Sequence, residues 1–381
     1  MSFMIGREKE IEILNEVCNL NKSSFVTIYG RFGIGKTYLV NYFFEKNRNN
    51  YLFFEFTGKY KTNTKIQIVN FIQQVYEWFH SEPNFEIKHW NDAFRFLKYT
   101  IDEEIQKRNH KEKIIIFLDE VPWIDEFNKS GFLSSLGYFW NTYCEERKNI
   151  ILILGGSNSS WMRDRLIQNA KGSLYQRVTH KISLKPFDFK ETYQYLVQEK
   201  EFILNKKSVI NYYMIFGGVP KYYSLLNSKE SDLVNINRLF FSIDTLMHNE
   251  YEDLFSFLFF KKAKYYKSII ELLCSRCTGY SLSDMAKILN IKSGAKLSSS
   301  LIELEECGYI KRIPNNRNLL RGTKYRIVDS YILFYNSWVK EFSRNDLANL
   351  DNDYWLNKCD CKSYEFWFDY ASEIVSISNI R

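Results

Sequence analysis

The stretch from Phe25 to Val40, FVTIYGRFGIGKTYLV, constrains the fold of this chain more than any other. An apolar, β-branched run ends at Gly30 and predicts a buried strand, and a helical pattern follows. Gly30, Gly35, Lys36 and Thr37 match the spacing G-x-x-x-x-G-K-[ST]. Small residues allow the backbone to wrap around a polyphosphate, and the helix that follows adds the positive end of its dipole. The stretch therefore predicts nucleoside triphosphate binding.

The chemistry of this loop assigns expected roles to its residues. Lys36 would reach the β- and γ-phosphates, and the Thr37 hydroxyl would bind Mg²⁺. A chance match in a glycine-containing turn is the alternative, but the strand before and the helix after the motif favour phosphate binding. The residues expected to contact ATP are Gly30, Arg31, Phe32, Gly33, Ile34, Gly35, Lys36, Thr37 and Tyr38.

A second apolar run, Ile114 to Leu118, ends in the acidic pair Asp119-Glu120. Because the run is apolar at every position, it predicts a parallel strand covered on both faces. Ligands of open α/β sheets bind at the carboxyl ends of such strands. Asp119 is expected to hold Mg²⁺ through water, and Glu120 to orient or deprotonate the attacking water. The pair favours a hydrolysing enzyme over a pair of solvated loop acids.

Further apolar runs at 51–56, 150–154 and 179–186 alternate with helical patterns, which predicts an α/β fold with a parallel, doubly wound sheet. The segment GGSNSS follows Leu154, so Ser157 or Asn158 would contact the γ-phosphate or the water; a tight turn of small residues is the equal alternative. Arg177 would stabilise γ-phosphate charge in the transition state, unless it is a surface salt-bridge former.

The second half of the chain reads as mostly helical. Phe216-Gly-Gly-Val-Pro220 predicts a forced break between helices, within a helical lid in which Lys221 or Tyr222 faces the nucleotide. Beyond it, three helices and a β-hairpin predict a winged helix. Its expected helices span 269–274, 282–289 and 294–307, and its expected strands span 309–313 and 323–327. The tail is aromatic and helical, and its last stretch, Glu373 to Ile380, reads as strand-like.

Positive charge concentrates in the winged-helix region. Residues 261–340 contain 15 Lys and Arg against 6 Asp and Glu, whereas the whole chain carries a net charge of only +7. This predicts a polyanion partner such as DNA, although a merely solvated surface is an equal alternative, and winged helices also serve as protein-binding modules. The expected contact residues are Lys292, Lys296, Ser298, Ser299, Ser300, Lys311, Arg312, Arg317 and Arg321.

Composition adds the expected location. No apolar run approaches the roughly 20 residues that a membrane span needs, and the first residues, MSFMIGREKE, lack the apolar core of a signal peptide. Seven cysteines without a dense framework fit reduced thiols. We therefore expect a cytoplasmic protein without a membrane partner.

The motifs GRFGIGKT, IIIFLDEVPW, GGSNSSWM, LYQR before ISLKPF, and FGGVPKYY occur in this order. In this the chain resembles prokaryotic, archaeal-type P-loop ATPases of the AAA+/STAND kind, which carry a C-terminal winged helix and often a restriction-endonuclease-like domain. The resemblance implies ATP and Mg²⁺ as cofactors, a catalytic Glu120, a sensor role for Ser157 and a lid role for Gly217 to Pro220. Gln176 departs from the Gly that relatives commonly place before Arg177, and the chain ends before a nuclease core, so nuclease activity is not expected.

The expected organisation is an α/β ATPase core of the AAA+-like type (1–185), a helical lid (186–260), a winged helix (261–330) and a helical tail (331–381). The expected function is an ATP-hydrolysing switch that couples nucleotide state to a DNA-binding winged helix. The alternative is a signalling or scaffold ATPase whose winged helix binds its own body or a protein partner rather than DNA. A homo-oligomer is a further expected form.

Overall fold

The structure is a computed structural model, and it describes residues 4–45, 51–108, 113–125, 130–242, 245, 247–292, 294–314, 323–351, 354–358 and 361–379. The chain divides into two compact units. The sheet unit comprises residues 7–31 and 35–185, and the helical unit comprises residues 1–6, 32–34 and 186–381. The middle of the glycine-rich loop thus groups with the helical unit, whereas both of its flanks belong to the sheet unit.

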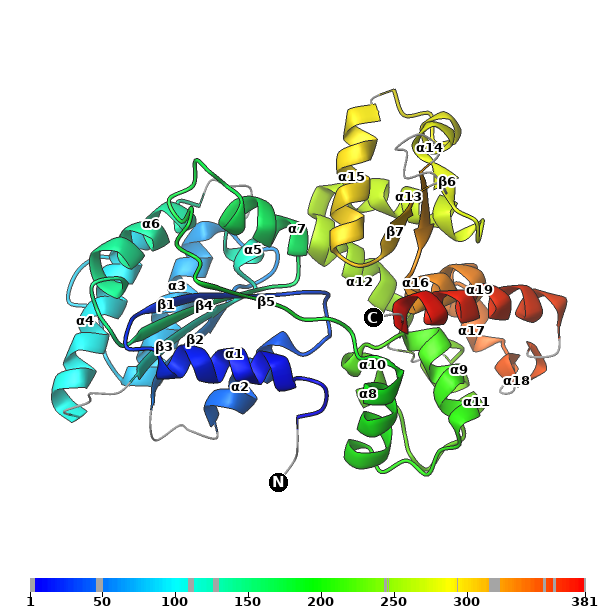
Figure 1. Cartoon of the computed structure of the whole chain (residues 1–381), viewed down its shortest axis with the longest axis horizontal. Coiled ribbons are helices and arrows are strands. Elements are labelled where there is room, and N and C mark those ends of the chain that lie inside the picture. The colour runs from blue at the N-terminus through cyan, green and yellow to red at the C-terminus, as the bar shows by residue number, and fades with distance from the viewer. Residues whose placement is uncertain are drawn as a thin grey trace. The chain divides into compact units, whose positions relative to one another are not determined.

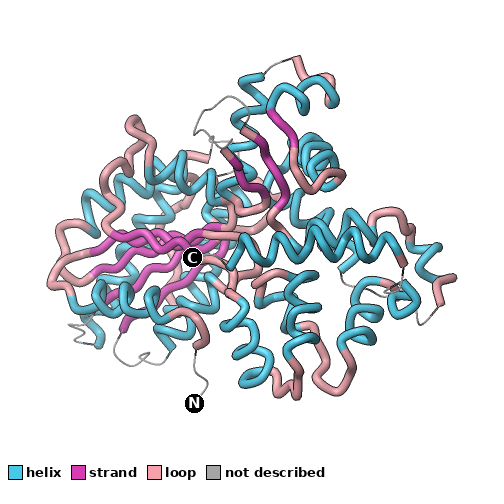
Figure 2. Tube along the Cα trace, turned by 45° about the vertical axis from the view of Figure 1, so that its right-hand side comes forward, coloured by secondary structure: helices cyan, strands magenta, loops and turns pink. Residues whose placement is uncertain are grey.

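The sheet unit is built on five parallel strands in the order β2-β3-β4-β1-β5 (Figures 1 and 2). Its strands are β1 (Ser24–Tyr29), β2 (Tyr51–Thr57), β3 (Lys113–Asp119), β4 (Ile150–Gly156) and β5 (His180–Ser183). Its helices are α1 (Glu8–Asn19), α2 (Lys36–Glu45), α3 (Thr64–Phe79), α4 (Trp90–Arg108), α5 (Val121–Ile124), α6 (Phe132–Phe139) and α7 (Ser159–Met162). The π-helical turns η3 (Trp140–Cys144) and η4 (Arg163–Ile167) extend α6 and α7. The expected parallel α/β fold is confirmed.

The burial of each strand follows from its place in the sheet. Every residue of β4 is buried, and β3 is buried from Ile114 onward, because helices cover both faces of the inner strands. Helices α1 and α2 cover one face, and α3, α4 and α6 cover the other (Figure 1). The edge strand β2 instead alternates: Leu52, Phe54 and Phe56 enter the core with α3 and α4, whereas Phe53 and Glu55 are half-buried on the opposite face.

The helical unit begins with helices α8 (Phe189–Gln194), α9 (Lys206–Phe216), α10 (Pro220–Ser224), α11 (Asp232–Phe240) and α12 (Met247–Phe259). The expected break is confirmed, since α9 ends at Phe216 and α10 begins at Pro220. The π-helical turn η5 (Tyr195–Glu199) extends α8, and the 3₁₀ turn η6 (Phe260–Lys262) follows α12. Among the described residues, no helix is long and apolar enough to span a membrane.

Three helices and a small antiparallel sheet follow within the same unit. They are α13 (Ala263–Cys274), β6 (Tyr280–Ser281), α14 (Leu282–Ile288), α15 (Gly294–Glu306), β7 (Ile310–Ile313) and β8 (Lys324–Ile327). Strand β8 lies between β6 and β7, with Ile310 opposite Ile327. The chain continues with α16 (Ser330–Phe334), η7 (Tyr335–Val339), α17 (Arg344–Ala348), α18 (Tyr354–Lys358) and α19 (Lys362–Asn379).

The strand-like interpretation of residues 373–380 is wrong, because helix α19 runs through Asn379; Ile380 lies outside the described residues. Trp367, Tyr370, Ala371 and Ile374 recur at helical spacing, and all four side chains are buried. This packing outweighs the β propensity of the Ile-Val-Ser-Ile run, as tertiary context commonly does.

Candidate functional site

Strand order brings the ends of three strands together at one edge of the sheet. Strand β4 lies between β1 and β3, and all three run parallel. The residues that follow β4 therefore emerge between the glycine-rich loop after β1 and the acidic pair at the end of β3. This placement depends on long-range pairing, which explains why the spacing of the motifs along the chain does not reveal it.

Lys36 is the charged centre of this edge. It is the first residue of α2 and is buried, and its Nζ donates to Gly30 O at 3.0 Å, to Arg31 O at 3.1 Å and to Ser157 Oγ at 2.9 Å. Gly35 precedes it with φ 92°, a conformation that side chains strain, so the chain needs glycine at this turn. Burial lowers the pKa of Lys36, and the carboxylates of Glu120 and Asp119 oppose that effect.

The hydroxyl of Thr37 and the carboxylate of Asp119 lie in direct contact. Thr37 Oγ1 donates to Asp119 Oδ2, and Asp119 Oδ1 accepts from the backbone N–H of Glu120 at 2.9 Å. A Cβ added to Gly155 would collide with the Asp119 carboxylate and lie 3.1 Å from the Phe117 ring, so a larger residue there would displace Asp119. A hydroxyl beside a buried carboxylate is a donor set that suits Mg²⁺, which prefers oxygen ligands. These residues thus fit the expected metal site.

Glu120 is held by Ser157. Its Oε1 accepts from Ser157 Oγ, and its Oε2 accepts from the Ser157 backbone N–H at 3.1 Å. Glu120 also has φ 46° and ψ 47°, a left-handed conformation that is uncommon for a residue with a side chain and is found at functional sites. Burial raises the pKa of Glu120, Lys36 lowers it, and Asp119 raises it. Lys36, Ser157 and Glu120 form one buried polar chain.

The other expected site residues are placed as follows. Tyr38 is exposed and stacks on Tyr42, with ring centroids 6.2 Å apart. Asn158 caps α7 by accepting from the Trp161 N–H at 2.9 Å, so its side chain has a structural role there. Arg177 donates to Glu145 at 2.7 Å in a partly exposed ion pair, and this bond does not join the polar chain around Lys36.

The loop residues Phe32, Gly33 and Ile34 make their contacts within the helical unit. The backbone N–H of Lys221 donates to Gly33 O at 3.1 Å, and its Nζ lies 4.6 Å from the centroid of the Phe32 ring. Nζ also pairs with Glu250 at 2.7 Å. Lys221 was expected in a lid, and it contacts the loop; Tyr222 is buried.

Sequence interpretation missed Gly155 as a site residue and missed the bond between Glu120 and Ser157. The pair Gly155-Gly156 at the end of β4 is the sequence feature that could have identified Gly155. No signal in the sequence announces the left-handed conformation of Glu120, because it depends on what packs around the end of β3.

Comparison with known proteins supports this description. The "Uncharacterized protein MJECL04" of Methanocaldococcus jannaschii is 27% identical over 347 residues, which cover 88% of this chain and 68% of that protein. The Walker-type ATPase PABY2304 of Pyrococcus abyssi has 17% identity and a TM-score of 0.58, with 87% of this chain and 96% of that chain covered. The ORC2 protein of Aeropyrum pernix, in its ADPNP-ADP complexes, has 13% identity and a TM-score of 0.44, with 100% and 96% covered.

The likeness to the Pyrococcus abyssi structure shows a shared fold. The family of ATPase domains found predominantly in Archaea matches residues 4–226, which is more than half of the chain and includes the whole sheet edge described above. The chain therefore belongs to this family of ATPase domains.

Proposed function

We propose that this protein is an ATP-hydrolysing switch whose nucleotide state controls a DNA-binding winged helix. The buried polar chain from Lys36 through Ser157 to Glu120, beside the Thr37–Asp119 contact, carries the first half of this proposal. It gathers a cation for phosphates, a metal-binding pair and a candidate base at one edge of a parallel sheet.

Each residue has a role that its position supports. Lys36 would exchange its bonds with Gly30 O and Arg31 O for bonds to the β- and γ-phosphates, and the N–H groups of residues 30–38 would line the polyphosphate. Thr37 and Asp119 would hold Mg²⁺, which neutralises phosphate charge when bound. A catalytic role for Arg177 stays a prediction, and it requires the ion pair with Glu145 to open.

Ser157 decides when Glu120 acts. While its hydroxyl and N–H both hold the Glu120 carboxylate, that carboxylate is not available to a water molecule. A γ-phosphate next to Ser157 would compete for the same hydroxyl, and Glu120 would then accept from water as a general base. We infer that Ser157 senses the γ-phosphate, as expected from its place after β4.

The second half of the proposal rests on exposed basic residues within 261–330. Lys292, Lys296 and Ser299 on or beside α15 are exposed, as are Lys311 and Arg312 on β7. Ser300 is buried and donates to Lys296 O at 2.9 Å, so we no longer count it as a phosphate contact. Arg317 and Arg321 lie outside the described residues. Such a surface suits a phosphate backbone.

One observation favours the alternative function, in which this module binds protein. Arg326 of β8 is buried, pairs with Glu373 of α19 at 2.5 Å and lies 5.4 Å from the Tyr370 ring. Arg326 of this module therefore already binds α19, another element of the helical unit. A protein surface could extend this interface.

The ATPase rate with and without duplex DNA, at low and moderate salt, separates the two functions. We expect DNA to stimulate the rate and the stimulation to fade with salt, because phosphate contacts release counterions. Lys292→Ala with Lys296→Ala should abolish the stimulation and keep the basal rate. Lys206→Ala with Lys207→Ala, on the exposed face of α9, is the matched control.

Stimulation that is equal in both double variants, or that does not change with salt, would contradict a winged-helix DNA site. ATP binding without any DNA stimulation would favour the protein-binding alternative. A chain that binds no ATP at all would overturn the proposal as a whole.

A further inference from the structure

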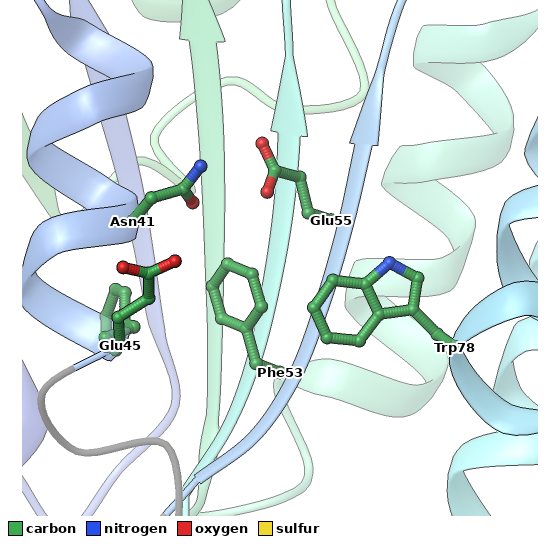
Figure 3. A pocket seen from close by; sticks show the side chains of 6 residues that line it. Asn41, Glu45, Phe53, Glu55 and Trp78 are labelled. Atoms are coloured by element: carbon green, nitrogen blue, oxygen red, sulfur yellow. The ribbon is translucent and has the colours of Figure 1, made fainter.

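A cavity of about 110 Å³ opens at the edge of the sheet unit, apart from the phosphate loop (Figure 3). It lies between the last turns of α2, the edge strand β2 and α3. Its lining consists of Asn41, Phe44 and Glu45 from α2, Phe53 and Glu55 from β2, and Trp78 from α3. All six residues belong to one unit, so the cavity is defined by a single body.

The cavity follows from the alternation of β2. Strand β2 is an edge strand, with no strand of the described residues on its outer side, and its residues 53 and 55 point away from the main core. The Phe53 ring lies 5.8 Å from the Phe44 ring and 5.4 Å from the Trp78 ring, measured between centroids. The floor of the cavity is therefore aromatic, with π faces available on a partly exposed surface.

The polar groups of the lining are almost all acceptors. In Figure 3 the Glu55 carboxylate lies above the Phe53 ring, the Glu45 carboxylate lies to its left, and the Asn41 amide lies between the two carboxylates. The Oδ1 atom of Asn41 is buried and has no hydrogen-bond partner among the described residues. Within the same described set, no ion pair includes Glu45 or Glu55.

Among the described residues, no cation pairs with the half-buried carboxyl of Glu55. Burial raises its pKa to about 6, and the negative charges of Asp119 and Glu45 add to this effect, although the Asn41 amide opposes it. A cation in the cavity would remove this cost, because buried carboxylates require pairing.

We propose that this cavity binds an organic cation, a primary ammonium or guanidinium group on a short apolar stem. The charged group would donate to Glu45, Glu55 and Asn41 Oδ1, and the described lining contains no cation that would compete for them. The stem and the face of the cation would lie against Phe53 and Trp78, as cations do over aromatic rings. An anion is excluded by the two carboxylates.

A bare metal ion fits the cavity poorly. Hard cations need several oxygen ligands around one point, but the described lining offers only two carboxylates and one amide, and its other three residues are aromatic. The described residues contain no group of three or more His, Cys, Asp or Glu that could hold a metal. A bare metal ion also has no apolar part that could pack against the aromatic rings of the lining.

The cation could be a free small molecule or a side chain. The chain itself carries Lys46 and Arg48 directly after α2, so it contains one possible source. Agmatine, which has a guanidinium and an ammonium group on a butyl stem, is a suitable free probe for either case.

Titration calorimetry of the full chain with agmatine, in the absence of nucleotide, tests the proposal. We expect saturable binding that weakens by about tenfold or more in Glu55→Gln and in Trp78→Leu. Glu77→Gln is the matched control, because Glu77 is an exposed acid next to Trp78 that contacts only Gln73 and Gln74 in its hydrogen bonds. Magnesium chloride at the same concentration should not compete with agmatine.

The variant Lys46→Ala with Arg48→Ala separates the two sources. If the unmodified chain binds agmatine, a free cation is the ligand. If only this double variant binds, and Glu55→Gln abolishes that binding, the chain supplies the cation itself. Binding that neither Glu55→Gln nor Trp78→Leu weakens, or no binding in any variant, would overturn the proposal. Circular dichroism of each variant ensures that a loss of binding is not a loss of fold.

Discussion

At the scale of single residues, Glu120 combines a strained backbone with a carboxylate that Ser157 holds. Strain of this kind persists only where surrounding structure enforces it. The contacts of Asp119 on one side and Ser157 on the other supply that enforcement. The conformation thus places Glu120 at the edge of the sheet, where its carboxylate could exchange its bonds from Ser157 for a bond from water.

Glu120→Gln should keep ATP binding and abolish hydrolysis, because the amide oxygen can keep one of the two bonds from Ser157 but the amide cannot act as a base. We expect a loss of at least about 100-fold in rate, as for other general bases. Phosphate release and binding of a fluorescent ATP analogue measure the two properties separately. An unchanged rate would remove Glu120 from the mechanism.

Lys36→Ala should lose ATP affinity. Among the described residues, Lys36 supplies the only ammonium group that donates to Gly30 O, Arg31 O and Ser157 Oγ. The same analogue titration measures the loss. Wild-type affinity in this variant would contradict the phosphate-loop assignment. Lys22→Ala, an exposed lysine before β1, serves as the control.

Glu55 gives a prediction about pH. Its pKa is raised to about 6 in the folded chain, so the folded state binds this proton more tightly than the unfolded state does. Stability is therefore lost as pH rises from about 4.5 to 6, and stays lost above that range. Glu55→Gln should raise the melting temperature at pH 8 by about 2 to 4 °C, for a gain of about 1 kcal/mol, and should leave it nearly unchanged at pH 4.

The melting curves for this prediction are recorded without agmatine or nucleotide, and Glu77→Gln should show no such pH dependence. A Glu55→Gln variant that is equally stable to the wild type at both pH values would show that the carboxyl carries no burial cost.

At the scale of elements, the inner strands could be predicted from the sequence, but the order of the strands in the sheet could not. Ile114 to Leu118 and Ile150 to Leu154 are apolar throughout, and both proved to be buried strands. Their order in the sheet depends on pairing between distant residues, which no local pattern encodes. Local propensity also failed at the end of the chain, where the burial of Trp367, Tyr370 and Ile374 imposes a helix.

The candidate site shows the same division. The chemical types of Lys36, Thr37, Asp119 and Glu120 were readable from motifs, and the structure brings them together. The choice between Ser157 and Asn158 needed three-dimensional information, because both are small polar residues after the same strand. The sequence did not predict the cavity beside Glu55. Most residues of β2 are aromatic, so the sequence alone does not show that buried and half-buried positions alternate along this strand.

At the scale of the whole molecule, the phosphate loop belongs to two bodies. Residues 32–34 group with the helical unit, and Gly35 and Lys36 group with the sheet unit. Lys221 and Phe257 contact Phe32 within the helical unit, with ring centroids of Phe32 and Phe257 5.9 Å apart. The residues of the loop are therefore divided between the two units.

The consequence concerns the cooperativity of unfolding. A chain with two compact units can melt in two calorimetric transitions. A ligand that binds only the folded loop stabilises the parts of the chain that must be folded to form that loop. We expect a non-hydrolysable ATP analogue with Mg²⁺ to raise both transitions and bring them together. In Phe32→Ala the analogue should raise mainly the transition of the sheet unit. If the analogue raises only one transition in the wild type as well, nucleotide binding does not couple the unfolding of the two units. If it raises both transitions, nucleotide binding makes the unfolding of the two units cooperative.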